Sequence, residues 1–202
     1  MREVTPLVSG GTLGVFLGVH ALRRGYDAVL YTYNLDIFDP SWFEEGAEDL
    51  SARLEAQIRV KPVERLRVAT KAYLDFLELG GRIRFEELRP ELIRHHLTQG
   101  EPILTGLSAT YLYGCAREVE RDGRLQYDSV QGEPMGHFVL VHGYDPATDS
   151  VLVAAPLHEN RFGSHNYRVG VVRLLGAIML GVLTYDGNLL VVRTRAEAED
   201  GS

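Results

Sequence analysis

Cysteine is almost absent from this chain, whose 202 residues include only Cys115. A single thiol excludes an internal disulfide framework and a zinc site built from several thiolates. Free cysteine in globular proteins usually behaves as a small apolar side chain in the interior. We therefore interpret Cys115 as a buried packing residue.

Positive charge is also scarce. Lys and Arg number 21 against 28 Asp and Glu, which gives a formal net charge of −7. Such a chain has no general attraction for phosphate backbones, so we expect no nucleic-acid partner. His95 and His96 are adjacent, and neighbours on a helix point about 100° apart, which disfavours a metal site shared by the two. We therefore interpret them as part of a solvated face. We expect neither a cofactor nor a metal.

Long hydrophobic runs are missing as well. The longest apolar stretch, 169–183, contains Arg173 and is shorter than the roughly 20 residues that a membrane helix requires. Residues 1–6 do not begin the apolar core of a secretory signal. These two observations predict a cytoplasmic protein that does not bind membranes.

The elements that are present divide the chain into a helical first half and a strand-rich second half. Apolar spacing predicts helices over 12–24, 41–60, 62–79, 90–98 and 171–180. β-branched and aromatic runs predict strands over 27–33, 82–85, 103–107, 137–144, 150–154 and 188–193, with an exposed loop at 121–134. This pattern predicts an α+β fold in which helices pack on an antiparallel sheet. We expect one domain over 1–195 and a disordered acidic tail at 196–202.

One predicted hairpin carries a candidate catalytic group. His137 follows Gly136 at the head of the strand 137–144, and a turn rich in Asp and Pro leads to the strand 150–154. A cysteine hydrolase needs a thiol at a helix amino end, an imidazole within hydrogen-bond reach, and a group that orients the imidazole. His137 suits the imidazole. His142 alternates to the opposite face of the strand and cannot share the same site.

The segments 100–104, 136–145 and 151–156 resemble the bacteriocin-processing peptidase family. Members of this family are papain-like cysteine peptidases that cut leader peptides after a double glycine. Weaker similarity extends to 11–26, which resembles the family's second helix, and to 181–186, which resembles its closing strand. The resemblance implies a papain-like fold, His137 as the catalytic histidine, and a peptide or protein as substrate or ligand.

The chain departs from the family pattern at two positions. The resemblance implies an aspartate just before the proline of the second strand, where this chain has Ala155. It also implies a Cys-Gly-Pro motif on a first helix, which nothing here matches, and Cys115 does not map to it. Covalent catalysis cannot survive loss of the thiol, whereas loss of the orienting carboxylate leaves partial activity. We therefore hypothesise a non-catalytic, peptidase-related domain that retains a peptide-binding cleft.

Two other functions stay open. The chain is either a fragment of an active cysteine peptidase whose nucleophile lies upstream, or an unrelated structural or interaction protein with His137 as an ordinary strand histidine. Absence of the first helix also predicts exposed apolar surface, which a homodimer or a rearrangement of 12–24 would cover.

Several polar and aromatic residues near the hairpin have more ordinary alternatives. His158 and Asn160 are candidate substitutes for the missing carboxylate, and with Glu159 and His165 they are also a candidate metal group. A solvated loop is the simpler interpretation. Tyr111 and Tyr113, which follow Ser108, either line a peptide groove or pack in the interior, and we favour packing.

Overall fold

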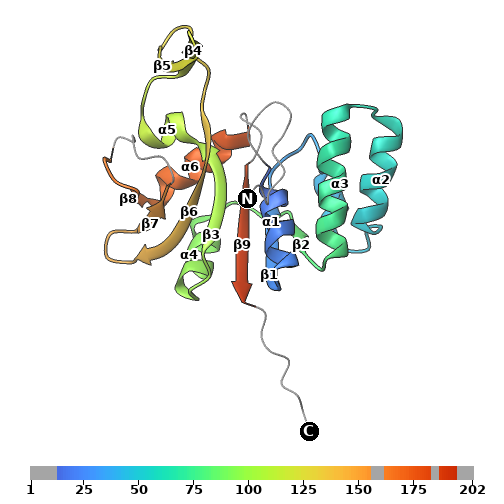
Figure 1. Ribbon diagram of the computed structural model, residues 1–202. Coiled ribbons are helices and arrows are strands. Elements are labelled where there is room, and N and C mark those ends of the chain that lie inside the picture. The colour runs from blue at the N-terminus through green and yellow to red at the C-terminus, as the bar shows by residue number, and fades with distance from the viewer. Residues whose placement is uncertain (1–12, 156–161, 183–186, 195–202) are drawn as a thin grey trace.

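A seven-stranded sheet forms the centre of the protein (Figure 1). The computed structural model describes residues 13–155, 162–182 and 187–194. The strand order is β2-β1-β9-β3-β6-β7-β8, and neighbours are antiparallel except for the parallel pair β1 and β2. A separate hairpin of β4 and β5 projects from one end of the sheet. The strands are β1 Tyr26–Thr32, β2 Arg82–Arg84, β3 Ile103–Ser108, β4 Glu118–Arg121, β5 Arg124–Tyr127, β6 Gly136–Asp145, β7 Ser150–Ala154, β8 Asn166–Gly170 and β9 Asn188–Thr194.

Helices cover both faces of this sheet, because its central strands are apolar on both sides. In β1, Leu30 packs into a cluster with α1 and α3, whereas Val29 and Tyr31 pack into a second cluster with α4, α5 and α6. Successive strand residues point to opposite faces, so these two helical groups lie on opposite sides. The helices are α1 Gly14–Arg23, the 3₁₀ helix η1 Pro40–Phe43, α2 Leu50–Val60, α3 Glu64–Glu78, α4 Pro90–Thr98, α5 Ala109–Tyr113 and α6 Val171–Gly181.

Local sequence sets several of these boundaries. The Asp49 carboxylate accepts a hydrogen bond from the Ala52 amide at 3.2 Å and caps α2, while Pro90 occupies the first turn of α4. Gly114 ends α5 in the left-handed conformation, with φ of 60°, which glycine adopts without steric cost.

The α1–α3 layer does not extend over the whole sheet. On β6 the positions that alternate with the buried Val139 and Val141 include half-buried Phe138 and Leu140, whose side chain is 38% exposed. Leu152 of β7 is also half-buried. Within the described residues, none of the helices α1, α2 and α3 covers this face of β6 and β7. The side chains there form an apolar strip in contact with solvent.

The structure confirms the α+β class with a mostly antiparallel sheet, and the more specific papain-like fold stays a prediction. The single helix predicted over 41–60 was wrong, because the chain turns at Gly46 with φ of 79° and separates η1 from α2. The loop predicted over 121–134 was wrong in part, since β5 lies within it. The short helix α5 had not been predicted.

Some predicted features fall outside the described residues. These include the first residue of the helix predicted over 12–24, the tail 196–202 and the loop positions 158–160. Among the helices that are described, none combines the length and the apolar character needed to cross a bilayer.

Candidate functional site

His137 is the second residue of β6. It pairs with Leu107 of β3, and its side chain lies on the same face of the sheet as Val139 and Val141. The side chain is half-buried, and its Nε2 atom is shielded from solvent with no hydrogen-bond partner among the described residues. Buried polar atoms in folded proteins are nearly always paired, so each exception calls for an explanation. Among the described residues, the His137 imidazole therefore has an unused hydrogen-bonding position.

The strand head that carries His137 is held by three local hydrogen bonds. The Ala109 amide donates to the Met135 carbonyl at 2.8 Å, and the Met135 amide donates to Thr110 Oγ1 at 2.8 Å. Ser108 Oγ accepts from the Tyr111 amide at 3.3 Å and caps α5. Because α5, the end of β3 and the start of β6 form one hydrogen-bonded corner, the backbone that presents the imidazole is rigid.

Ala155 occupies the position expected for an orienting carboxylate. Leu140 pairs with Ala154, so one further step along this register places Ala155 on the face that holds His137. Its methyl group is buried in the apolar cluster, with 5% exposure. The neighbouring His165 does not supply a replacement for the carboxylate, because its Nδ1–H donates to the Ala155 carbonyl at 2.9 Å. The described part of the chain thus places no acid at this position.

Cys115 is unsuited to act as a nucleophile. It follows the carboxyl end of α5, and the helix dipole favours thiolate at the opposite end of a helix. The side chain is half-buried against the apolar cluster, and burial raises the pKa of its thiol. The predicted packing role agrees with this environment.

Tyr113 and Tyr111 differ in their surroundings. Tyr113 is buried, and its hydroxyl lies 3.1 Å from that of Tyr167, on whose ring Phe162 stacks. Tyr111 is 42% exposed, and the Arg173 guanidinium lies over its ring at 5.3 Å from the centroid. The packing interpretation therefore holds for Tyr113, whereas Tyr111 is a surface residue fixed by α6.

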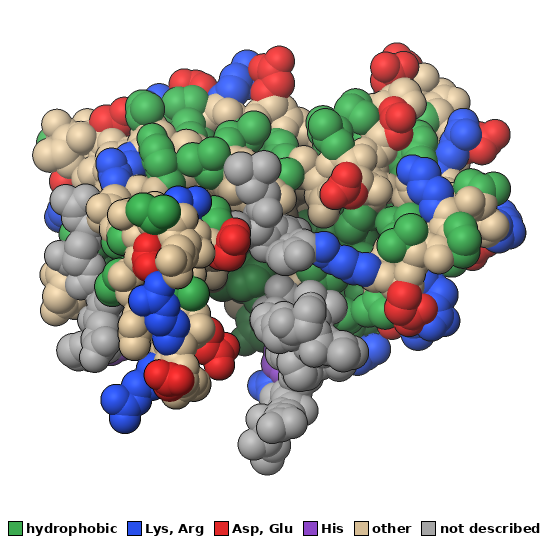
Figure 2. Space-filling view, turned by 90° about the horizontal axis from the view of Figure 1, so that it is seen from above, with side chains coloured by type: hydrophobic (Ala, Val, Ile, Leu, Met, Phe, Trp, Pro, Cys, Tyr) green, Lys and Arg blue, Asp and Glu red, His purple; other side chains and the backbone are tan. Residues whose placement is uncertain are grey.

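A second feature lies at the same edge of the sheet as His137. Thr32 at the end of β1 pairs with Asn188 at the start of β9, Asn188 pairs with Gly106, and Gly106 pairs with Phe138. Three strand spacings of about 4.8 Å put roughly 14 Å between the end of β1 and the head of β6. Viewed from this edge, the molecule is hollowed between the α2–α3 side and the β4–β5 side, with hydrophobic side chains at the bottom (Figure 2).

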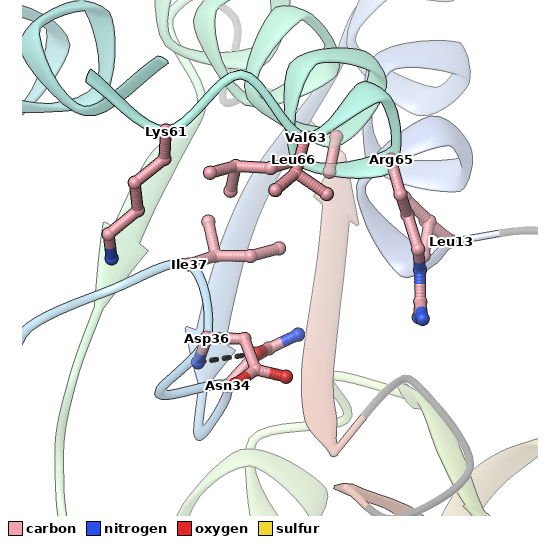
Figure 3. A pocket seen from close by; sticks show the side chains of 9 residues that line it. Leu13, Asn34, Asp36, Ile37, Lys61, Val63, Arg65 and Leu66 are labelled. Carbon is pink, nitrogen blue, oxygen red and sulfur yellow. Dashed lines mark hydrogen bonds between the residues drawn. The ribbon is translucent and has the colours of Figure 1, made fainter. Parts of the chain in front are cut away.

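Beside the end of β1 there is a cavity of about 280 Å³. It lies between the start of α1, the turn after β1 and the first two turns of α3, and Figure 3 shows the apolar side chains at its centre. Its lining consists of Leu13, Asn34, Asp36, Ile37, Lys61, Val63, Arg65, Leu66 and Ala69. Sequence reasoning missed this cavity, because three segments far apart in the chain contribute to it.

The sequence-based interpretation of His96 was wrong. Its side chain is buried, with 3% exposure, and Nδ1 lies 2.7 Å from Glu101 Oε2 while Nε2 lies 3.0 Å from the Tyr31 hydroxyl. Arg193 extends the network through a 3.2 Å contact with Glu101. His95 is the exposed member of the pair, so the adjacent histidines do diverge as helix geometry requires. This network joins α4 to β1 and β9.

A metal site is not evident within the described ranges 13–155, 162–182 and 187–194, where no group of three or more His, Cys, Asp or Glu side chains is arranged to hold an ion. Comparisons with protein-family models, curated proteins and solved structures give no significant match.

Proposed function

We propose that this chain is a papain-like, peptidase-related domain that binds peptide segments at the head of β6 and does not hydrolyse them with a cysteine of its own. The observation that carries the proposal is the imidazole of His137, whose Nε2 is buried and unpaired among the described residues. Leaving such a group unpaired costs about 1–3 kcal/mol. Its presence on a rigid strand head is better explained by contact with a ligand than by packing.

The absence of catalysis is argued from the two other groups that a cysteine hydrolase requires. Ala155 offers a methyl group where the orienting carboxylate would lie. Burial raises the pKa of the Cys115 thiol, which disfavours the reactive thiolate. A histidine that lacks the orienting carboxylate and the thiolate can still donate one hydrogen bond to a peptide group or accept one from it.

Nuclear magnetic resonance of the histidine rings tests the binding role. A short peptide that ends in Gly-Gly is titrated into the full chain, with the His137 signals assigned from His137→Gln. We expect a saturable shift of the His137 signals, while those of the exposed His142 stay in place. The same peptide with Val-Val at its end is the matched control. Absence of any His137 shift at millimolar peptide would remove the binding role.

Mass spectrometry of the same samples tests the absence of hydrolysis. We expect the peptide to remain intact in the presence of the chain and of Cys115→Ser alike. Cleavage that needs a reducing agent and disappears in Cys115→Ser would show that the chain has its own nucleophile.

A second candidate function is an active peptidase whose nucleophile lies upstream of Met1. The exposed apolar strip around Phe138, Leu140 and Leu152 favours it, because a preceding helix would cover these side chains. Expression with an upstream in-frame Cys-Gly-Pro segment should then give thiol-dependent turnover, and failure to do so counts against this function.

A homodimer would cover the same strip. Light scattering measures the molar mass of the parent chain and of Leu140→Lys and so tests for this homodimer. A dimer formed through the strip should dissociate in Leu140→Lys, whereas a dimer formed elsewhere should persist.

A further inference from the structure

The cavity beside the end of β1 has buried apolar walls. Four apolar lining residues are between 3% and 9% exposed: Leu13 at the start of α1, Ile37 in the turn after β1, and Leu66 and Ala69 in α3. A volume of about 280 Å³ equals the share of roughly nine water molecules in the liquid, at about 30 Å³ each. Such a space holds a short hydrocarbon body, and apolar walls favour that body over water.

The rim of the cavity carries two cationic side chains, Lys61 and Arg65. Lys61 Nζ donates to the neutral Gln57 Oε1 at 3.2 Å, and in the part of the chain that the structure describes it forms no ion pair. Gln57 in turn donates from Nε2 to the Ile37 carbonyl at 2.9 Å, so the rim is tied to the apolar wall. Asp39 interacts electrostatically with Lys61 without forming an ion pair with it. In a chain of net charge −7, cationic side chains at a cavity mouth favour an anionic ligand.

The acidic lining residue lies away from Lys61. In Figure 3 Asp36 stands beside Asn34, whose Oδ1 accepts a hydrogen bond from the Asp36 amide at 3.0 Å, and the Lys61 side chain lies on another side of the cavity. An anionic group would be repelled near Asp36 and attracted near Lys61. Arg65, the other cation of the lining, lies on the opposite side of the cavity from Lys61. We place the anion at Lys61 because, among the described residues, its ammonium group donates to a neutral amide and forms no ion pair.

We propose that this cavity binds a small aliphatic carboxylate, with the carboxylate beside Lys61 and the hydrocarbon chain against Ile37 and Leu66. The proposal goes beyond peptide binding at His137 and does not depend on it. The ligand needs one anionic end and an unbranched or lightly branched apolar body, which is the chemistry of a short-chain or medium-chain fatty acid.

Calorimetric titration of the full chain with butanoate, hexanoate and octanoate tests the hydrocarbon part. Each buried methylene contributes about 0.8 kcal/mol in transfer experiments, which corresponds to roughly fourfold in affinity. We expect affinity to rise by about that factor per methylene until the cavity is full. Equal affinity across the series, or no heat of binding with any of the three acids, would overturn the proposal.

Neutral and peptide probes test the ligand class. 1-Octanol has the same hydrocarbon body as octanoate without the charge, and we expect it to bind roughly twofold to fivefold more weakly, as loss of one partly exposed charge interaction implies. Octanol that binds as well as octanoate refutes the role of Lys61. A short peptide ending in leucine that binds where octanoate does not would show that the site is built for peptides.

Two matched pairs of variants locate the site. Val63 is the residue before α3, is 56% exposed at the cavity rim, and provides no side-chain cap for the helix. Val63→Ser and Val63→Asp both supply a cap and should fold at least as well as the parent, but only the aspartate adds negative charge at the rim. We expect octanoate binding to survive Val63→Ser and to fall at least tenfold in Val63→Asp.

Lysine substitutions form the second pair. Lys61→Ala should weaken octanoate binding roughly twofold to fivefold, whereas Lys71→Ala, on the exposed side of α3, should leave it unchanged. If both lysine variants, or both Val63 variants, behave alike, the carboxylate does not bind at this rim and the proposal is wrong.

Discussion

Replacing Tyr31 and Tyr33 separately by phenylalanine tests how the polar network on β1 contributes to stability. Tyr31 lies near the end of β1 and Tyr33 directly follows the last residue of that strand, and each substitution removes one hydroxyl. The Tyr31 hydroxyl lies 3.0 Å from Nε2 of His96, which is 3% exposed. The Tyr33 hydroxyl is buried with no hydrogen-bond partner among the described residues. The same chemical change should therefore have opposite consequences.

Tyr31→Phe leaves a buried imidazole nitrogen unpaired, which costs about 1–3 kcal/mol of unfolding free energy. With a urea m-value of about 2–3 kcal/mol/M for a domain of this size, the midpoint of unfolding should fall by roughly 0.3–1.5 M. Tyr33→Phe removes a hydroxyl that gains no bond on folding, so stability should stay constant or rise by up to about 1 kcal/mol. Equal losses in the two variants would refute this account of the network.

The pH dependence of unfolding gives a second readout for the same variants. Burial raises the pKa of Tyr31 above 10, with Glu86 as the next cause, and burial also raises the pKa of Tyr33. The unfolded chain loses these protons near pH 10, whereas the native state keeps them to higher pH. The contribution of the two hydroxyls to stability is therefore fully present below pH 10. This contribution is lost as pH rises through the native pKa values. Each phenylalanine variant should therefore lose less stability in alkali than the parent.

Three further predictions address packing, acid stability and thiol reactivity. Gly18→Ala should lower the free energy of unfolding by about 1–3 kcal/mol, because its new methyl group would lie 2.6 Å from the aromatic ring of Phe76 in α3. Gly170→Ala faces open space, so in thermal unfolding it should lose only the difference in N-cap preference at α6, about 1 kcal/mol or less. Hydrogen bonds from Arg94 lower the pKa of Asp149, so stability that is present above about pH 4 should decline in stronger acid. Asp149→Asn should flatten that decline in urea titrations between pH 2 and 6, and an unchanged acid limb would contradict the assignment. Burial raises the pKa of the Cys115 thiol, so its reaction with a disulfide reagent at pH 7 should be slower than that of free cysteine; faster reaction would contradict this environment.

The hairpin of β6 and β7 was predictable because its signals are local. Alternating apolar residues and a turn with Asp and Pro predicted strands 137–144 and 150–154, and the structure has Gly136–Asp145 and Ser150–Ala154. The hairpin of β4 and β5 also had a local signal that was overlooked. Asp122 and Gly123 have φ of 54° and 71°, the backbone that an Asp-Gly hairpin turn adopts. Polar composition alone suggested a loop there, because β5 and the second half of β4 are exposed.

The candidate sites were less predictable, because they depend on contacts between distant segments. His137 could be selected from its place in a strand, but its unpaired Nε2 depends on what surrounds it in the folded chain. His96 was assigned to a solvated face, since nothing in the helix sequence indicates that Tyr31 and Glu101 would enclose it. The cavity near Lys61 combines three segments, and no spacing rule joins them.

The central position of β9 bears on how the chain is made. β9 lies between β1 and β3, so the sheet consists of the pair β2-β1 and the group β3-β6-β7-β8 until Asn188–Thr194 is in place. During synthesis these residues leave the ribosome after all other described strands. Until then, β1 and β3 present unpaired edges, and such edges promote association between chains. Association between nascent chains is therefore favoured most before β9 closes the sheet.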